Sequence, residues 1–256
     1  MVSLGDTPQV LADIDAEWLS RSLGGRVDDF SSTTIGSGEG FMGQLARVTL
    51  RGSNVPDSVI VKLPTSDPGG QMIGQMMRVW EREHRFYTEV AHRVTGVRLA
   101  RCLHSSAEPY ALILEDLSPA KPGDQVAGPT PEQARTAIDV AASLHGQWFD
   151  HPELPTLDWM PSIDDPMSAS VGTMFPMGWP MFLERYQDSL PSRVLSWCET
   201  FAPMVESWIT GYTDWPCTLT HGDFRLDNMF YDADGAMTLI DWQLSMRAPS
   251  TTDLVY

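Results

Sequence analysis

The first part of the chain alternates apolar and polar residues in a way that predicts a small sheet with two helices. Residues 13–23 have the spacing of an amphipathic helix, with Ile14, Trp18 and Leu19 on its apolar side. Strand-like segments follow at residues 33–36, 44–50, 58–63, 97–104 and 110–115. Residues 75–94 repeat apolar positions at helical spacing, so we expect one long helix between the third and fourth strands.

The second half of the chain is predicted to be mainly helical, with a short hairpin near its end. Pro131–Trp148 begins with proline and has an apolar side made of Ala134, Ile138, Ala141, Ala142 and Leu144. Residues 193–212 are expected to form a helix in which Pro203 is a possible break. Short strands are expected at 218–220, 228–232 and 237–241. The composition changes near 115–119, which predicts two units, residues 1–115 and 116–256.

Charge and cysteine content narrow the class of protein. The chain has 17 basic and 34 acidic residues, a net charge of −17, which argues against nucleic-acid or anionic-membrane binding. Its three cysteines are widely spaced and form no C-x-x-C pair, so a reducing, cytoplasmic location is expected rather than a disulfide framework or zinc site. The N-terminus lacks a signal-peptide pattern, and no apolar run reaches the roughly 18 residues of a membrane span.

The segment richest in chemistry is residues 221–228, His-Gly-Asp-Phe-Arg-Leu-Asp-Asn. A turn signal at 232–235 predicts a hairpin in which Asn228 lies opposite Asp241, with Cβ atoms about 5 Å apart. A carboxylate and an amide oxygen held together suit Mg²⁺. Asp223, on the loop that enters the hairpin, is free to act as a base. Phosphoryl transfer requires this arrangement, because one Asp accepts the hydroxyl proton while Asn and Asp hold Mg²⁺ on the nucleotide phosphates.

These residues resemble the catalytic loop of the aminoglycoside phosphotransferase and choline-kinase-like family, which has a protein-kinase-like fold. Ile240-Asp241-Trp242 is similar to the family's metal-binding motif. Leu114-Glu115-Asp116-Leu117 and Gly123-Asp124-Gln125 are similar to the branch that includes ecdysteroid-kinase-like proteins. The resemblance covers nearly the whole chain. It implies an α+β fold of two lobes: an N-lobe with a small antiparallel sheet and one helix, and a mainly helical C-lobe with the catalytic hairpin.

The same resemblance implies ATP-dependent transfer of the γ-phosphate to a hydroxyl of a small molecule. Aminoglycosides, choline-like alcohols and steroid alcohols occur among the substrates of relatives, and the sequence does not choose between them. Gly222 stands where protein kinases have the Arg that reads activation-loop phosphorylation, and no A-P-E segment follows Asp241. Both absences favour a small-molecule kinase over a protein kinase.

A nucleotide-anchoring lysine is implied on the third strand. Lys62 is the only lysine among residues 1–115 and lies in an otherwise apolar strand, where it needs a partner. Glu83 shares the apolar stripe of the long helix, whereas Glu81 and Glu89 each have an Arg four residues later and are expected to face solvent. The resemblance implies a Lys62–Glu83 ion pair, with Glu81 as the alternative partner.

Glycines between the first two strands are candidates for a phosphate cover. Gly36, Gly38 and Gly40 would let backbone amides approach phosphate, although many hairpins are also rich in glycine. In the resembling fold, the hinge after the last strand binds the adenine edge. The Glu115 C=O and the Leu117 N–H are the implied contacts, and Asp116, between them, equally suits a helix or turn cap.

Two further residues of the catalytic segment have alternative interpretations. Arg225 occupies the place where protein kinases usually have a Lys that touches the transferred phosphate, and the alternative is an exposed Arg paired with Asp227. His221 is expected to be a structural hydrogen-bonding residue rather than a base. The remaining histidines show no metal-ligand spacing.

The C-terminus resembles the start of the helix that follows the catalytic hairpin in the family, and its residue Asp253 is implied to anchor the catalytic loop. Family members continue with further helices, so the chain is expected to be truncated and to expose an apolar patch near Leu254 and residues 197–208. Two alternatives stay open. One is a non-catalytic nucleotide-binding module, and the other is a metal-dependent phosphoesterase, for which the extra His or Asp ligands are lacking.

Overall fold

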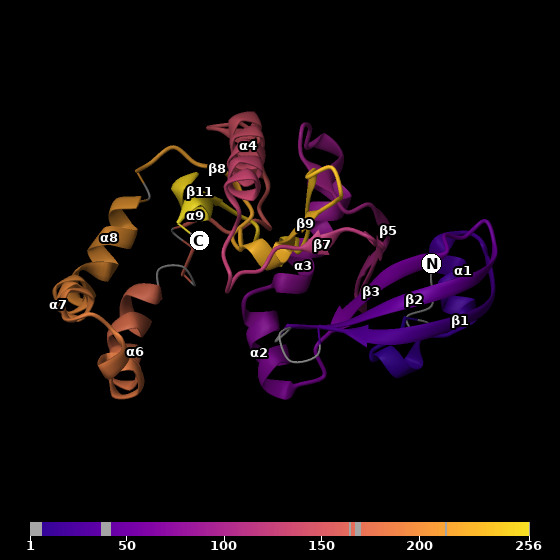
Figure 1. Cartoon of the computed structure of the whole chain (residues 1–256), viewed down its shortest axis with the longest axis horizontal. Coiled ribbons are helices and arrows are strands. Elements are labelled where there is room, and N and C mark those ends of the chain that lie inside the picture. The colour runs from indigo at the N-terminus through magenta and orange to yellow at the C-terminus, as the bar shows by residue number, and fades with distance from the viewer. Residues whose placement is uncertain (1–6, 37–41, 164, 167–169, 213, 256) are drawn as a thin grey trace.

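A computed structural model describes residues 7–36, 42–163, 165–166, 170–212 and 214–255 of the chain. Its N-terminal part is a five-stranded antiparallel sheet in the order β1-β2-β3-β6-β5 (Figure 1). The strands are β1 (Arg26–Ile35), β2 (Gly43–Ser53), β3 (Ser58–Pro64), β5 (Cys102–Ala107) and β6 (Tyr110–Glu115). The fold is therefore α+β with an N-terminal antiparallel sheet, as the sequence predicts.

The first helix, α1 (Ala16–Leu23), contributes to the core of the sheet. Asp15 caps it by accepting a hydrogen bond from the Trp18 N–H, so the helix begins later than the predicted residue 13. Ile14, Trp18 and Leu19 are buried, as expected. Strand β1 is much longer than the predicted 33–36. The sequence pattern does not indicate its full length because this edge strand is mostly exposed and polar and shows no apolar alternation.

The prediction of one helix over residues 75–94 is wrong. The segment forms α2 (Pro68–Met76) and α3 (Val79–Arg85), followed by a π-helical turn and a 3-10 turn that end at Arg93. The break falls at Arg78, whose φ is +56°. A tertiary contact accompanies it: Trp80 packs so closely on Gly74 that a Cβ there would lie 2.7 Å from the Trp80 ring. Periodicity along the chain does not report such a contact.

The second part of the chain combines small sheets with helix α4. Strands β4 (Arg98–Leu99), β10 (Met237–Leu239), β9 (Met229–Tyr231) and β7 (Lys121–Pro122) form one sheet in that order. Strands β8 (Thr218–Thr220) and β11 (Met246–Ala248) pair separately. Helix α4 spans Pro131–Trp148, as predicted, and Thr130 begins it with a capping box.

The predicted apolar side of α4 is only partly correct. Ala141 and Leu144 are buried, but Ile138 is 55% exposed. Ala137 and Trp148 take its place in the core. The buried side is therefore rotated by about one residue from the prediction.

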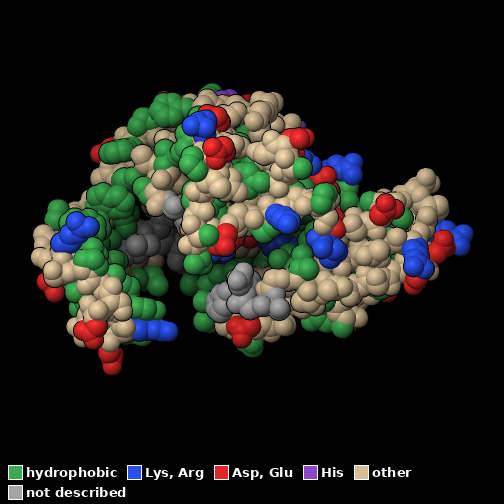
Figure 2. All heavy atoms as spheres, in the orientation of Figure 1, with side chains coloured by type: hydrophobic (Ala, Val, Ile, Leu, Met, Phe, Trp, Pro, Cys, Tyr) green, Lys and Arg blue, Asp and Glu red, His purple; other side chains and the backbone are tan. Residues whose placement is uncertain are grey.

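Three helices form the end of the molecule farthest from the N-terminal sheet (Figure 1). They are α6 (Val171–Tyr186), α7 (Ser192–Phe201) and α8 (Val205–Tyr212). A 3-10 turn containing Pro203 separates α7 from α8, as anticipated. Hydrophobic side chains gather on this end of the surface (Figure 2), including Met177, Met181, Trp197 and Trp208. No helix within the described ranges is long and apolar enough to cross a membrane.

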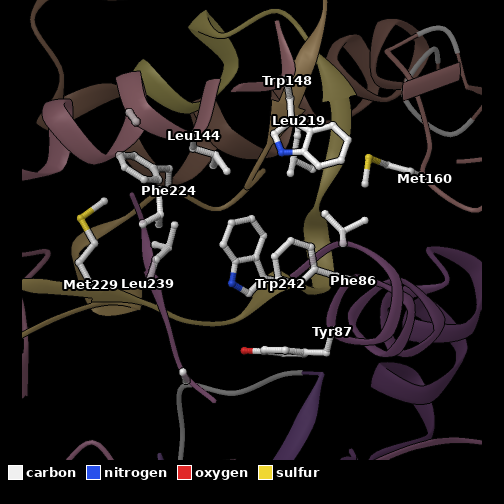
Figure 3. Close-up of a cluster of buried hydrophobic side chains, with 14 of the residues drawn as sticks. Phe86, Tyr87, Leu144, Trp148, Met160, Leu219, Phe224, Met229, Leu239 and Trp242 are labelled. Atoms are coloured by element: carbon white, nitrogen blue, oxygen red, sulfur yellow. The ribbon is translucent and has the colours of Figure 1, made fainter. Parts of the chain in front are cut away.

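The larger hydrophobic core joins the end of α3, helix α4 and the β9–β10 hairpin. Figure 3 shows Phe86, Leu144, Leu219, Leu239 and Trp242 meeting there, and each of these side chains is fully buried. The smaller core lies between the sheet and α1. Helix α3 is thus packed against the segment that carries the catalytic loop.

Candidate functional site

Lys62 lies in the middle of the N-terminal sheet, paired with Leu45 of β2 and Leu112 of β6. Its Nζ is 2.8 Å from Oε2 of Glu83 on α3 and 2.7 Å from Oδ1 of Asp241. A buried ammonium is costly unless it is paired, and here two carboxylates pair it. The implied Lys62–Glu83 ion pair is present, and Asp241 is a second partner.

The charges of this cluster follow from burial and pairing. Burial alone would lower the pKa of Lys62, but the charges of Asp241 and Glu83 outweigh it and raise that pKa above its usual value. Burial raises the pKa of the Glu83 carboxyl, with the Lys62 charge opposing it. The Tyr110 hydroxyl donates a hydrogen bond to Glu83 Oε2 over 2.7 Å. Lys62 therefore remains an ammonium held between two acids.

The other two acids of this segment lie on the solvent side, as predicted. Glu81 pairs with Arg78 at 2.8 Å and lies 3.9 Å from Arg85. Glu89 pairs with Arg85 at 2.6 Å rather than with the expected Arg93. Arg93 ends the 3-10 turn that follows the π turn, and it pairs with Glu153 at 2.6 Å. Lys62 contacts Glu83, and the alternative partner Glu81 pairs with Arg78 instead.

His221 holds the start of the catalytic loop. It is fully buried, its Nδ1 accepts the Asp223 N–H at 3.2 Å, and its Nε2 lies 2.8 Å from the Ile240 carbonyl oxygen. The first contact leaves the ring proton on Nε2, where it donates to Ile240. His221 is therefore the structural hydrogen-bonding residue that the sequence predicts.

Position 222 has no room for any residue other than glycine. Its φ is +79°, and a Cβ would lie 2.1 Å from the Leu244 carbonyl oxygen. In the sequence, Gly222 stands out only as a departure from protein kinases. The close approach of the two backbones is the physical reason for the glycine.

Asp223, Arg225 and Asn228 come together on the loop. The Asn228 Nδ2 donates to the Asp223 carbonyl oxygen and to Asp223 Oδ2, each at 2.9 Å. Arg225 lies between two acids, with Nε 3.5 Å from Asp223 Oδ2 and Nη1 3.7 Å from Asp227 Oδ2. The buried Arg225 Nε makes no hydrogen bond within the described residues. The pairing of Arg225 with Asp227 is present, and its guanidinium also faces Asp223.

The predicted register of the hairpin is wrong by one residue. Met229 pairs with Leu239, so Asn228 lies opposite Ile240, whose N–H donates to the Asn228 carbonyl oxygen at 3.1 Å. The turn causes the shift. Asp232 N–H donates to the Ala236 carbonyl oxygen, and the Asp232 carboxylate accepts the Ala236 N–H, which shortens the expected four-residue loop to three. Asp241 therefore comes one residue after the position opposite Asn228 and is not directly opposed to it.

Asp241 follows the hairpin in a strained backbone conformation. Its φ is +67°, which for a non-glycine residue costs on the order of 1–3 kcal/mol and is concentrated at functional sites. The next residue, Trp242, stacks on Phe86 (Figure 3), with ring centroids 3.8 Å apart. Trp242 also packs edge-on against His221. These contacts fix Asp241 between α3 and the catalytic loop.

Asp253 anchors the loop from the short helix α9 (Thr251–Leu254). Its two carboxylate oxygens accept the backbone N–H groups of His221 and Gly222, each at 2.8 Å. His145 of α4 reaches the same carboxylate, with Nε2 2.8 Å from Oδ2. The implied anchoring by Asp253 is present. The contact of His145 with Asp253 has no signal in the sequence, because the two residues are far apart along the chain.

The hinge candidates lie at the end of β6. Glu115 is the last residue of the strand, and its side chain accepts the Arg101 N–H at 2.9 Å. The Asp116 carboxylate accepts the Ser118 N–H at 3.0 Å and the Ser58 hydroxyl at 2.8 Å, so its interpretation as a turn cap is confirmed. The Leu117 carbonyl oxygen accepts the Ala120 N–H at 2.8 Å, which continues the turn.

Of the three glycine candidates, Gly36 follows β1 and has a φ of +68°. Gly38 and Gly40 lie outside the described residues. A surface hollow of about 690 Å³ borders this region, and Gly36 and Gly43 are among its lining residues. The lining includes neither Lys62 nor the acids of the catalytic loop.

No group of three or more His, Cys, Asp and Glu side chains in the described part of the chain is placed to hold a metal ion. A cation at this site would need other oxygen donors beside Asp241. The Asn228 amide nitrogen faces Asp223, so the amide oxygen is the atom left to meet a cation.

A buried ion pair between a sheet lysine and a helix glutamate, with an Asp after the hairpin as second partner of the lysine, is typical of kinase-like phosphotransferases. The model of the phosphotransferase enzyme family, APH, matches residues 43–256, and the chain belongs to this family. No curated protein sequence matches the chain.

Solved structures of aminoglycoside and macrolide phosphotransferases share the fold at low identity. Macrolide 2′-phosphotransferase MphH from Brachybacterium faecium is 19% identical with a TM-score of 0.53, over 92% of this chain and 73% of that chain. APH(2″)-IIa, in a ternary complex with streptomycin and ATP, is 13% identical with a TM-score of 0.56, over 94% and 76%. Spectinomycin phosphotransferase APH(9)-Ia, in complex with ADP and spectinomycin, is 12% identical with a TM-score of 0.57, over 95% and 73%.

Proposed function

We propose that this protein transfers the γ-phosphate of ATP to a hydroxyl group of a small molecule. The observation that carries the proposal is a chain of contacts from Glu83 through Lys62 to Asp241. Asp241 directly follows Ile240, whose N–H donates to the carbonyl oxygen of Asn228, the residue that hydrogen-bonds Asp223. Phosphoryl transfer needs a cationic phosphate anchor, metal-binding oxygens and a base in one place. Family membership and the nucleotides named in two of the matched structures agree with this assignment.

Asp223 is the proposed general base. The Asn228 side chain orients its carboxylate by donating to Oδ2, which leaves Oδ1 to accept the proton of an acceptor hydroxyl. The Arg225 Nε lies 3.5 Å from Asp223 Oδ2, and the planar guanidinium of Arg225 is proposed to bind the transferred phosphate group. Asp223 would thus act on the acceptor hydroxyl and Arg225 on the phosphate group, the two groups that form the new bond.

Asn228 and Asp241 are the proposed holders of Mg²⁺, through the Asn228 amide oxygen and the Asp241 carboxylate. Both are oxygen donors, which suit this cation, and the remaining positions would be taken by phosphate oxygens and water. The cation supplies positive charge that offsets the phosphates. Asp241 Oδ1 lies 2.7 Å from Lys62 Nζ, so the proposed metal ligand and the proposed phosphate anchor meet at one point.

Lys62 and Glu83 are proposed to position the nucleotide phosphates. Gly36, Gly38 and Gly40 are proposed to cover them, and the Glu115 C=O and the Leu117 N–H to bind adenine. In this assignment residues 1–115 form the nucleotide-binding lobe, and residues 116–256 supply the base, the metal ligands and part of the acceptor site.

The test is a screen of hydroxylated small molecules with Mg·ATP, in which ADP and the phosphate ester are followed by mass spectrometry. We expect ester formation with at least one acceptor, and ester formation slower by about 100-fold or more with Asp223→Asn. Binding of ATP without ester formation on any acceptor would instead indicate a nucleotide-binding module. Hydrolysis of phosphate esters without ATP would indicate a phosphoesterase.

A further inference from the structure

Tyr110, the first residue of β6, lies at the buried end of this chain of contacts. Its side chain is 4% exposed, and its hydroxyl donates to Glu83 Oε2 over 2.7 Å. The Lys62 Nζ faces the same carboxylate, 3.0 Å from Oε1 and 2.8 Å from Oε2. Glu83 therefore has one charged and one neutral donor.

A carboxylate with no solvent exposure depends on such donors, because water cannot replace them. Lys62 is a shared donor, since its Nζ also lies 2.7 Å from Asp241 Oδ1. Among the described residues, the Tyr110 hydroxyl makes a hydrogen bond only to Glu83. Lys62 is thus divided between two carboxylates, whereas the Tyr110 hydroxyl is directed at Glu83.

Tyr110 is suited to act only as a donor. Burial, with the Glu83 charge next to it, raises the pKa of Tyr110 well above its usual value, so the hydroxyl keeps its proton. Tyr87 provides a natural comparison. It is buried in the same region and its pKa is raised by the same causes, but its hydroxyl has no hydrogen-bond partner among the described residues.

We propose that Tyr110 is a positioning residue of the nucleotide site. Its hydroxyl fixes the Glu83 carboxylate, and the fixed carboxylate presents the Lys62 ammonium to the nucleotide phosphates. This inference rests on the proposed function, and it assigns a role to a strand residue outside the catalytic loop.

The test is calorimetric titration of Mg·ATP into the wild type, Tyr110→Phe and the matched control Tyr87→Phe. We expect Tyr110→Phe to raise Kd about tenfold, the scale of one hydrogen bond to a charged group. Tyr87→Phe should change Kd by less than about twofold, because it removes no hydrogen bond. Replacement of Tyr110 by 4-aminophenylalanine, which keeps a donor, should restore Kd to within about threefold of the wild type and preserve the fold.

A second background separates positioning from a general loosening of the fold. In Glu83→Gln there is no buried charge to hold, so adding Tyr110→Phe should change Kd by less than about twofold. An undiminished tenfold loss in that background would overturn the inference, as would equal Kd values for the wild type and Tyr110→Phe. Absence of Mg·ATP binding by the wild type would overturn the proposed function, and the role of Tyr110 with it.

Discussion

Single residues of the catalytic loop differ in what they contact, and the difference separates candidate roles. The Asp223 carboxylate is hydrogen-bonded by Asn228 and lies near Arg225, and only 13% of its side chain is exposed. Asp227, on the same loop, is 40% exposed and has Arg225 at 3.7 Å. The two acids are close in sequence and share one neighbour, which makes them a matched pair for substitution.

The first prediction is that Asp223→Asn lowers turnover on an identified acceptor by about 10²–10⁴-fold, because the variant cannot accept the hydroxyl proton. The affinity for Mg·ATP should stay within about threefold, since the base does not hold the nucleotide. Steady-state kinetics and calorimetry measure the two effects. Asp227→Asn is the control and should retain most activity. Full activity in Asp223→Asn would remove it as the base.

The second prediction concerns Asp116 and pH. Burial would raise the pKa of its carboxyl, but hydrogen bonds from Ser118, Ser58 and Arg47 lower it below the usual 3.8. A carboxyl whose pKa is lowered in the folded state stabilises the protein at pH values above its usual pKa. This stability is lost as the pH falls through the folded-state pKa. The free energy of unfolding should therefore favour the wild type over Asp116→Asn from pH 7 to about pH 4, and the gap should close below that. A gap that is constant down to pH 3 would contradict this account.

At the scale of elements, an ion pair joins β3 to α3, and an aromatic stack joins the π-helical turn that continues α3 to the residue after Asp241. Lys62 and Glu83 make the first contact, and Phe86 and Trp242 make the second. Glu83 and Phe86 lie three residues apart on the same stretch of helix. Movement of α3 would therefore disturb Lys62 and Asp241 together.

The third prediction is that Lys62 and Glu83 act as a unit. Lys62→Met and Glu83→Gln should each weaken Mg·ATP binding about tenfold or more, and the double variant should lose little beyond the larger single effect. Calorimetric titration of the four proteins gives the coupling energy. Losses that simply add would mean that the two residues act independently.

The elements also show where sequence alone is sufficient. Helix α4 is predicted to the residue because its start depends on a local capping box between Thr130 and Gln133. The hairpin register is missed because the Asp232 side chain shortens the turn, and the α2–α3 break is missed because Trp80 packs against Gly74. A capping box has a recognisable residue pattern, whereas a side-chain hydrogen bond inside a turn and a ring packed on a glycine leave no mark on the apolar periodicity.

The candidate site divides in the same way. The spacing of Asp223, Asn228 and Asp241 marks the loop, and a lone lysine in an apolar strand marks Lys62. Tyr110 gives no comparable signal, because a tyrosine that begins an apolar strand looks like an ordinary core residue. Its contact with Glu83 joins residues 27 positions apart and appears only in the folded chain.

At the scale of the whole molecule, an acidic chain carries a hydrophobic surface at one end. The net charge is −17, yet Met177 and Met181 of α6 are 75% and 73% exposed, and Trp197 of α7 is 60% exposed. Near the C-terminal helix, Leu254 and Val255 are also exposed, in agreement with the apolar patch expected there. Exposed apolar surface of this kind binds hydrophobic probes.

The fourth prediction is that the native protein enhances the fluorescence of a hydrophobic dye, and that Met177→Gln combined with Met181→Gln reduces the signal. Because both side chains are mostly exposed, Tm should change by less than about 2 °C. Val126→Gln, at a 98% exposed position outside the helical end, is the control and should leave the signal unchanged. A dye-silent wild type would contradict this description of the surface.

The most direct test of a shared nucleotide site is calorimetric titration of ATP, with and without Mg²⁺, into the wild type, Lys62→Met and Asp241→Asn. Asp234→Asn, in the hairpin turn, is the matched control. We predict binding by the wild type, a loss of about tenfold or more in Lys62→Met under both conditions, and a comparable loss in Asp241→Asn only when Mg²⁺ is present. No binding by the wild type, or equal binding by all four proteins, would contradict the assignment of these residues to a phosphotransfer site.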